Sequence, residues 1–267
     1  MTSHYQIFTS RCHIGKLSHC HIVKLPRCHI VKLSHCHVKF SRCHIVKLSH
    51  CNIVTLSNCH VITLSSCHVV TLSRNIVKLP HCHVKLSHCH IVKLSHCHVV
   101  VLSSCHIVIL SRCKIVTLSH CQVVTLSHCH VVKLSCCHIV KLSYCQVVIL
   151  SSCHIVTLSY CQVVTLTRCQ IVTLSYCQGV TFSRCQIVTL SNFHVVKLSR
   201  CHIVKLSHCH VVTLSHYQIV TSYCHIVTLS NCHVVTFSRY QIFTLSKNCV
   251  ADRDDGGGLS LSCWPTV

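Results

Sequence analysis

The sequence predicts an all-β protein, a parallel β-solenoid of short strands built from eight-residue repeats, in which coils can be imperfect or partly disordered. Three observations support this fold class. A unit of the form Cys-His-Ile/Val-Val-Thr/Lys-Leu-Ser-X recurs every eight residues. The unit is rich in β-branched residues, which suit a pleated surface. Its period is short and fixed, as in repeat proteins whose units pack only on their neighbours.

Consecutive units align along the chain without gaps: residues 121–128 read CQVVTLSH and residues 129–136 read CHVVKLSC. We name the eight positions the Cys, His, Ile/Val, Val, Thr/Lys, Leu, Ser and X slots. Four units hold seven residues, and the units at 36–42 and 82–88 each lack one apolar residue. A helix of 3.6 residues per turn would drift against this period and form no fixed apolar face.

No linker or change of composition interrupts the repeat, so we expect one octapeptide-repeat domain over residues 1–250. The segment 251–267 has a different composition. It holds all three acidic residues of the chain, followed by the glycines at 256–258. We expect this segment to be a disordered tail.

The slots suggest how a unit folds. Simple alternation fails because the Ile/Val and Val slots are adjacent and would face opposite sides of a strand. We therefore expect each unit to bend twice, so that the Cys, Ile/Val, Val and Leu slots all point inward. The His and Thr/Lys slots then point outward, and Ser-X forms the second bend. Coils of this kind stack and pair through their backbones.

The segment Leu56-Ser57-Asn58-Cys59-His60-Val61 resembles the Leu-x-Asn-Cys-x-Ile corners of right-handed parallel β-helices. This resemblance implies a coil corner at Asn58. Neither end of the repeat carries an obvious polar cap, so we expect self-association through uncapped strand edges.

The genetic code accounts for the consensus. The octanucleotide TGTCACAT, repeated three times, translates as Cys-His-Ile-Val-Thr-Leu-Ser-His. Because eight is not a multiple of three, all three forward frames give the same cycle, and none contains a stop codon. Frequent substitutions are single-base changes, including Lys for Thr, Gln for His and Pro for Ser. We interpret the chain as the translated product of an octanucleotide tandem repeat.

The composition is strongly basic and rich in cysteine and histidine. The chain has 24 Lys and Arg against three acidic residues, a formal charge of +21. This charge favours non-specific association with nucleic acid or anionic surfaces, and we expect no specific partner. No signal peptide or transmembrane segment is visible, so the localisation is unknown and cytoplasmic by default.

Seven His-Cys-His triplets are the candidate metal sites, because residues at i and i+2 of a strand share a face and imidazoles bind zinc, copper or nickel. The inward cysteines offer an alternative, a thiol ladder that binds soft metals or becomes oxidised. We expect no dedicated cofactor, with adventitious binding of zinc or copper. The paired histidines are His19, His21, His35, His37, His81, His83, His88, His90, His96, His98, His128, His130, His208 and His210.

Catalysis is not expected. A catalytic Cys-His pair needs a pre-positioned thiolate and an orienting third group, and no carboxylate precedes Asp252. We therefore predict that the protein is not an enzyme and has no dedicated biochemical activity. The alternative is a Cys/His-rich metal-binding or structural repeat protein.

Overall fold

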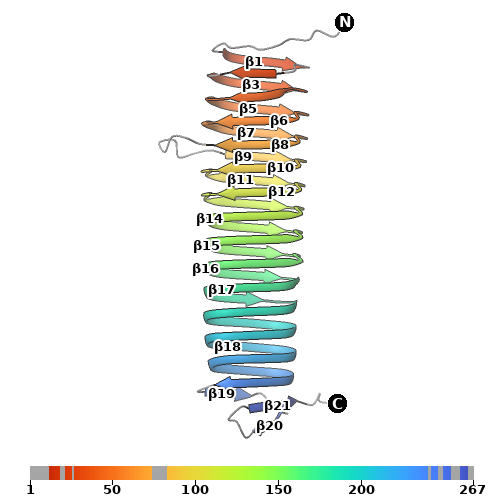
Figure 1. The fold of residues 1–267 in the computed structure, drawn as a ribbon, viewed down its shortest axis with the longest axis vertical. Coiled ribbons are helices and arrows are strands. Elements are labelled where there is room, and N and C mark those ends of the chain that lie inside the picture. Colours follow the sequence, from red (N-terminus) through yellow and green to blue (C-terminus); the bar gives the residue numbers. More distant parts are fainter. Residues whose placement is uncertain are drawn as a thin grey trace. The chain divides into compact units, whose positions relative to one another are not determined.

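The fold is a stack of β-strand coils, as a computed structural model of the chain shows (Figure 1). The structure describes residues 12–18, 22–25, 27–73, 83–239, 242–245, 249–253 and 259–263. Every regular element within these residues is a strand. Successive strands cross the view in opposite directions, whereas next-but-one strands lie above one another and pair in parallel. The predicted fold class, a parallel β-solenoid of short strands, is confirmed.

The chain divides into two compact units, 1–137 and 138–267, each described here by itself. The division lies within the segment expected to be one repeat domain. The first unit contains β1 (Cys12–Ser18), β2 (Ile22–Leu25), β3 (Cys28–Ser34), β4 (His37–Phe40), β5 (Cys43–Ser49), β6 (Ile53–Ser57), β7 (Cys59–Ser65), β8 (Val69–Ser73), β9 (His83–Ser87), β10 (Ile91–Ser95), β11 (Val99–Ser103), β12 (Ile107–Ser111), β13 (Ile115–Ser119) and β14 (Val123–Ser135). The second unit contains β15 (Ile139–Ser151), β16 (Ile155–Thr167), β17 (Cys169–Phe182), β18 (Cys185–Arg239), β19 (Ile242–Leu245), β20 (Cys249–Arg253) and β21 (Leu259–Cys263).

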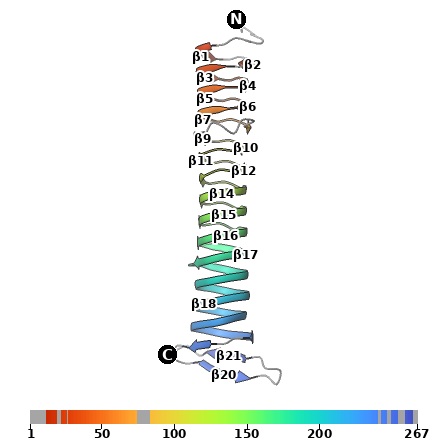
Figure 2. The same cartoon turned by 90° about the vertical axis from the view of Figure 1, so that its left-hand side faces the viewer.

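One coil consists of two octapeptide units, one on each side of the solenoid. Strand β5 pairs with β7, with Cys43 opposite Cys59, and β6 pairs with β8, with Val54 opposite Val70. Figure 2 separates β3, β5 and β7 on one side of the first unit from β2, β4 and β6 on the other. In the second unit, Cys145 lies opposite Cys161, two octapeptides later. Each residue therefore lies beside the residue of the same slot in the next coil.

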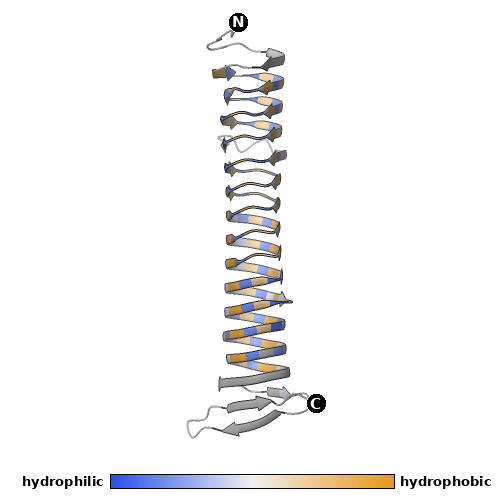
Figure 3. Ribbon diagram, turned by 90° about the vertical axis from the view of Figure 1, so that its right-hand side faces the viewer, coloured by the Kyte–Doolittle hydropathy of each residue, from blue (hydrophilic) through white to orange (hydrophobic). Residues whose placement is uncertain are grey.

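The core contains three slots of each octapeptide, not four. The Cys, Val and Leu slots are buried in both compact units of the chain; Val156, for example, is fully buried. The Ile/Val slot points outward, and Ile155 is 41% exposed. The expectation that this slot faces inward is therefore wrong. Because Ile/Val, Val, Thr/Lys and Leu belong to one continuous strand, strict alternation turns the first and third of them to solvent. Figure 3 shows this alternation of hydropathy along the ribbon.

Each octapeptide bends on both sides of its Cys slot, at the X slot and at the His slot, as at His96 and His98 around Cys97. Two bends were expected, but one of them lies at the His slot and not between the Ile/Val and Val slots. X-slot residues adopt a positive φ of 52° to 62° although they carry side chains, as His88, Arg112 and Tyr160 do. The turn brings the following Cys slot inward. The X-slot amide donates to the next coil, as from Arg112 N to Ser127 O at 3.0 Å. Asn58, at the corner that the sequence resemblance implies, has φ 54°.

The seven-residue units shorten the chain without interrupting the strand register. In β4 and β9, a histidine occupies the Ile/Val slot: His37 pairs with Ile22, and His83 pairs with Val61 and Val99. The buried slots therefore stay aligned, because the shortening places the polar residue in an outward slot.

The final strands differ from the coils. Strand β21 pairs antiparallel with β20 and with β18. Both β20 and β21 contain residues of the segment expected to be a disordered tail. The remaining residues of that segment, 254–258 and 264–267, lie outside the described residues.

Candidate functional site

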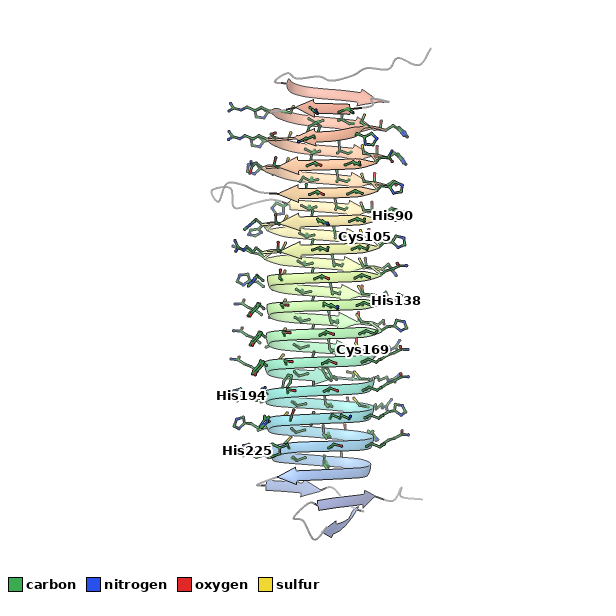
Figure 4. The ribbon with its side chains drawn as sticks, viewed as in Figure 1. His90, Cys105, His138, Cys169, His194 and His225 are labelled. Atoms are coloured by element: carbon green, nitrogen blue, oxygen red, sulfur yellow. The ribbon has the colours of Figure 1, made fainter. Side chains whose placement is uncertain are left out.

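Histidines of the His slot form exposed columns, by which we mean equivalent side chains in successive coils of one unit. Figure 4 shows His90 and His138 projecting outward from the strands. The rings stack nearly face to face, because their backbones repeat in register. Ring centroids lie 4.5–5.1 Å apart in the pairs His29–His44, His44–His60, His68–His90, His90–His106, His138–His154, His194–His210 and His210–His225.

Glutamine continues the column of His138 and His154 where it replaces histidine. The Nδ1 of His154 lies 2.8 Å from Oε1 of Gln170, and the Nδ1 of His202 lies 2.9 Å from Oε1 of Gln218. Because an amide oxygen only accepts, the imidazole donates through Nδ1. This leaves the other ring nitrogen, Nε2, as the acceptor in the neutral ring.

In the structure, the predicted site histidines that are described lie in columns of stacked coils. His19, His21 and His81 lie outside the described residues. The others are exposed or half-exposed, at His35, His37, His83, His88, His90, His96, His98, His128, His130, His208 and His210. In the triplets around Cys89, Cys97, Cys129 and Cys209, the first histidine sits in an X slot and the last in a His slot, with the buried cysteine between them. His37 and His83 instead occupy Ile/Val slots. The X-slot histidines can also stack, as His35 does on His50 at 5.1 Å.

Metal binding by the i and i+2 pairs stays a prediction. Within the described residues, no cluster of three or more His, Cys, Asp or Glu side chains is arranged to hold a metal ion. The stacking along columns was not anticipated from sequence. The signal for it was present, because His90, His106, His138 and His154 recur at multiples of two octapeptides.

Cysteines of the Cys slot form buried columns inside each unit, and Cys105 and Cys169 lie in the interior in Figure 4. In the first unit, one column runs through Cys36, Cys51, Cys67, Cys89, Cys105, Cys121 and Cys137. In the second unit, one column contains Cys145, Cys161, Cys177, Phe193, Cys209 and Cys224, and another contains Cys153, Cys169, Cys185 and Cys201. The cysteines of these columns are free thiols.

Most of these thiols share one local contact, which orients the columns. The Sγ donates to the carbonyl oxygen of the Ser-slot residue two positions earlier, at 3.7 Å for Cys145, 3.8 Å for Cys161 and 3.9 Å for Cys177. The neighbouring Cys59 thiol, followed by burial, raises the pKa of Cys43 above its ordinary value. The neutral thiol is therefore favoured at Cys43.

Lysines form a third kind of column on the outer face of the first unit. Lys16, Lys32 and Lys47 lie opposite one another on β1, β3 and β5. Lys32 and Lys47 are exposed. Like charges directly opposite on neighbouring strands repel and attract anions from solution.

A comparison of the chain with protein-family models, with curated proteins and with solved structures finds no match. Among the described residues, no helix has the length and apolar character needed to cross a membrane.

Proposed function

We propose that the chain is the translated product of an octanucleotide tandem repeat and has no dedicated biochemical activity. The supporting observation is that one octanucleotide encodes the consensus, and that frequent departures from it are single-base changes. The fold is then a physical consequence of the repeat, because alternate slots are apolar and the period matches half a coil.

The uniformity of the slots supports the same proposal. The Cys slot is buried at Cys105, Cys121 and Cys169 alike, and the His slot is exposed at His90 and His106. An active site requires one cysteine or histidine whose surroundings differ from those of its equivalents. In this chain, each group shares its surroundings with the same group one coil away.

The coding DNA provides the test. If the octanucleotide repeats directly in the DNA, synonymous positions will follow the same repeat as the others. If the codons are synonymously diverse while the peptide repeat persists, selection has acted on the protein and the proposal fails.

The second candidate is a Cys/His-rich metal-binding or structural repeat protein, favoured by the exposed histidine columns. Titration of the purified chain with zinc or copper tests it. Saturable, stoichiometric binding that is lost when the paired histidines are changed to alanine would support this candidate. Metal binding that these substitutions leave unchanged would count against this candidate.

Non-specific association with nucleic acid or anionic surfaces is proposed on the basis of the lysine column and the charge of +21. Such binding falls steeply as salt rises, because it depends on counterion release. Similar affinities for unrelated DNA sequences are expected, and a marked preference for one sequence would contradict the proposal. Self-association through uncapped coil edges is proposed as well, since such edges expose unpaired backbone groups.

A further inference from the structure

Three tyrosines of the second unit form a further column, which we call the tyrosine column. Tyr144, Tyr160 and Tyr176 occupy X slots of successive coils, and each adopts nearly the same left-handed φ, 53° to 54°. Their ring centroids lie 5.0 Å apart in both successive pairs, and the ring planes are within 3° of parallel. The in-register strands impose this repetition, because Cys145, which follows Tyr144, lies opposite Cys161.

The tyrosine column is open to solvent and to small reagents. Its side chains, at Tyr144, Tyr160 and Tyr176, are 53%, 48% and 50% exposed. Exposed side chains change rotamer within picoseconds to nanoseconds. Rotations of two neighbouring rings therefore bring their edges together, while the paired strands hold the two backbones in place.

Phenols held side by side have a characteristic oxidative reaction. A one-electron oxidant removes an electron from a phenol and the phenol proton passes to water, which leaves a neutral radical with its spin on the oxygen and on the ring carbons ortho to it. Two such radicals join through a bond between their ortho carbons. The hydrogen on each of these carbons is then replaced by one on the ring oxygen, which restores two phenols as dityrosine. In total, two tyrosines lose two electrons and two protons.

We propose that the tyrosine column is a site of oxidative modification, at which a one-electron oxidant couples Tyr160 to Tyr144 or to Tyr176 as dityrosine. Tyr160, the middle ring, stacks on both of the others. Holding two reacting groups together replaces a bimolecular encounter by an intramolecular step, which raises its rate. The inference is independent of the proposed function, because a column that arose without selection would react in the same way.

The test oxidises the full-length chain with ruthenium(III) tris(bipyridine), which a flash of light generates from the ruthenium(II) complex and persulfate. For each dityrosine, two ruthenium(III) ions each take one electron and return to ruthenium(II). Exposed thiols are first blocked with iodoacetamide, so that Cys136 does not consume the oxidant. The chain is then unfolded and digested with trypsin, which cleaves after Lys141, Arg168 and Arg184.

The digest separates the two possible products. A bond between Tyr144 and Tyr160 lies within the tryptic peptide 142–168, which loses the mass of two hydrogens. A bond between Tyr160 and Tyr176 joins this peptide to the peptide 169–184. Both products are expected from monomeric protein, together with the fluorescence of dityrosine. Their yield per chain should not depend on protein concentration, because the reaction takes place within one chain.

Three variants locate the reaction. Tyr160→Phe leaves Tyr144 and Tyr176 two coils apart, about 10 Å by the strand spacing, and is expected to abolish both products. Tyr176→Phe is expected to remove the joined peptides and to keep the bond between Tyr144 and Tyr160. Tyr223 provides the matched control, because its ring lies tilted at 59° against that of His208. Tyr223→Phe is expected to leave both yields unchanged.

Four results would overturn the proposal. These are the absence of both products from the unchanged chain, retention of either product in Tyr160→Phe, a loss in Tyr223→Phe as large as in Tyr160→Phe, and a yield per chain that rises with protein concentration. Circular dichroism establishes that each variant is folded. If Tyr160→Phe does not fold, Tyr176→Phe decides the question, because it must remove one product and retain the other.

Discussion

The X slot governs the turn of every coil, and its residues are unusual for the conformation they adopt. A positive φ near 55° is rare for residues with a side chain, although Asn and His enter this region more readily than others. His88 and Asn58 are of this kind, whereas Arg112 and Tyr160 are not. Backbone hydrogen bonds to the next coil maintain the conformation at His88 and Arg112.

A substitution at Arg112 tests this account. Arg112→Asn is expected to stabilise the fold by a few tenths to about 1 kcal/mol, because asparagine tolerates the left-handed conformation. Arg112→Val is expected to destabilise it by about 1–2 kcal/mol, since a β-branched side chain tolerates it poorly. Chemical denaturation measures both. Equal stability of the two variants would contradict the role assigned to the X slot.

The inward and outward slots of one strand can be compared directly. Leu158 is 1% exposed and Ile155 is 41% exposed, both on β16. Leu158→Ala is expected to cost about 2–5 kcal/mol, because it leaves a cavity. Ile155→Ala is expected to change the free energy of unfolding by less than about 1 kcal/mol. A similar cost for both would show that the Ile/Val slot is a core position.

At the scale of the strands, the register aligns identical charges as readily as identical apolar groups. Lys32 lies between Lys16 and Lys47. Lys32→Thr is expected to stabilise the fold by about 0.2–1 kcal/mol per pair removed at low salt, and by less at high salt. Thermal unfolding at two salt concentrations measures this.

Lys85 is the matched control for that substitution, because its neighbours across the strands are Thr63 and Val101. Lys85→Thr removes a charge without removing a like-charge pair. The salt-dependent gain expected for Lys32→Thr should therefore be absent. A stability gain of the same size in Lys85→Thr would show that net charge, and not the lysine column, causes the effect.

The coil itself is the unit that can be removed. Deletion of residues 155–170 takes out two octapeptides and brings equivalent slots back into register, as Ile155 and Ile171 are paired already. We expect this variant to keep its β-sheet circular dichroism. Deletion of 155–157 alone reverses the faces of the rest of the strand and should abolish cooperative unfolding. A cooperative transition in the second variant would contradict the register.

Considered over the whole chain, the sequence was sufficient to predict stacked parallel coils, since eight residues suit a strand plus a turn. The inward Val, Leu and Cys slots followed from the pattern. The outward Ile/Val slot did not, because hydrophobicity alone places Ile155 in the core. The number of residues per coil could not be predicted either. It depends on the turn at the X slot, where Arg, Tyr and Ser give no sequence signal for a positive φ.

The candidate sites were predicted less completely. Sequence spacing suggested pairing of His88 with His90, whereas ring contacts join His90 to His68 and His106. Contacts between coils join residues about two octapeptides apart. This separation equals the number of residues in a coil, which the sequence alone did not predict. The inward thiols were anticipated, because a Cys slot next to an outward His slot must face the core.

The seven-residue repeat units have a genetic consequence. The strands stay aligned where a unit has lost a residue, with His37 and His83 taking an outward slot. Because every forward frame of the octanucleotide encodes the same cycle, the gain or loss of a base would return the ribosome to the same peptide at a different phase. A frameshift, which destroys most proteins, would here leave one irregular corner and a different C-terminal end.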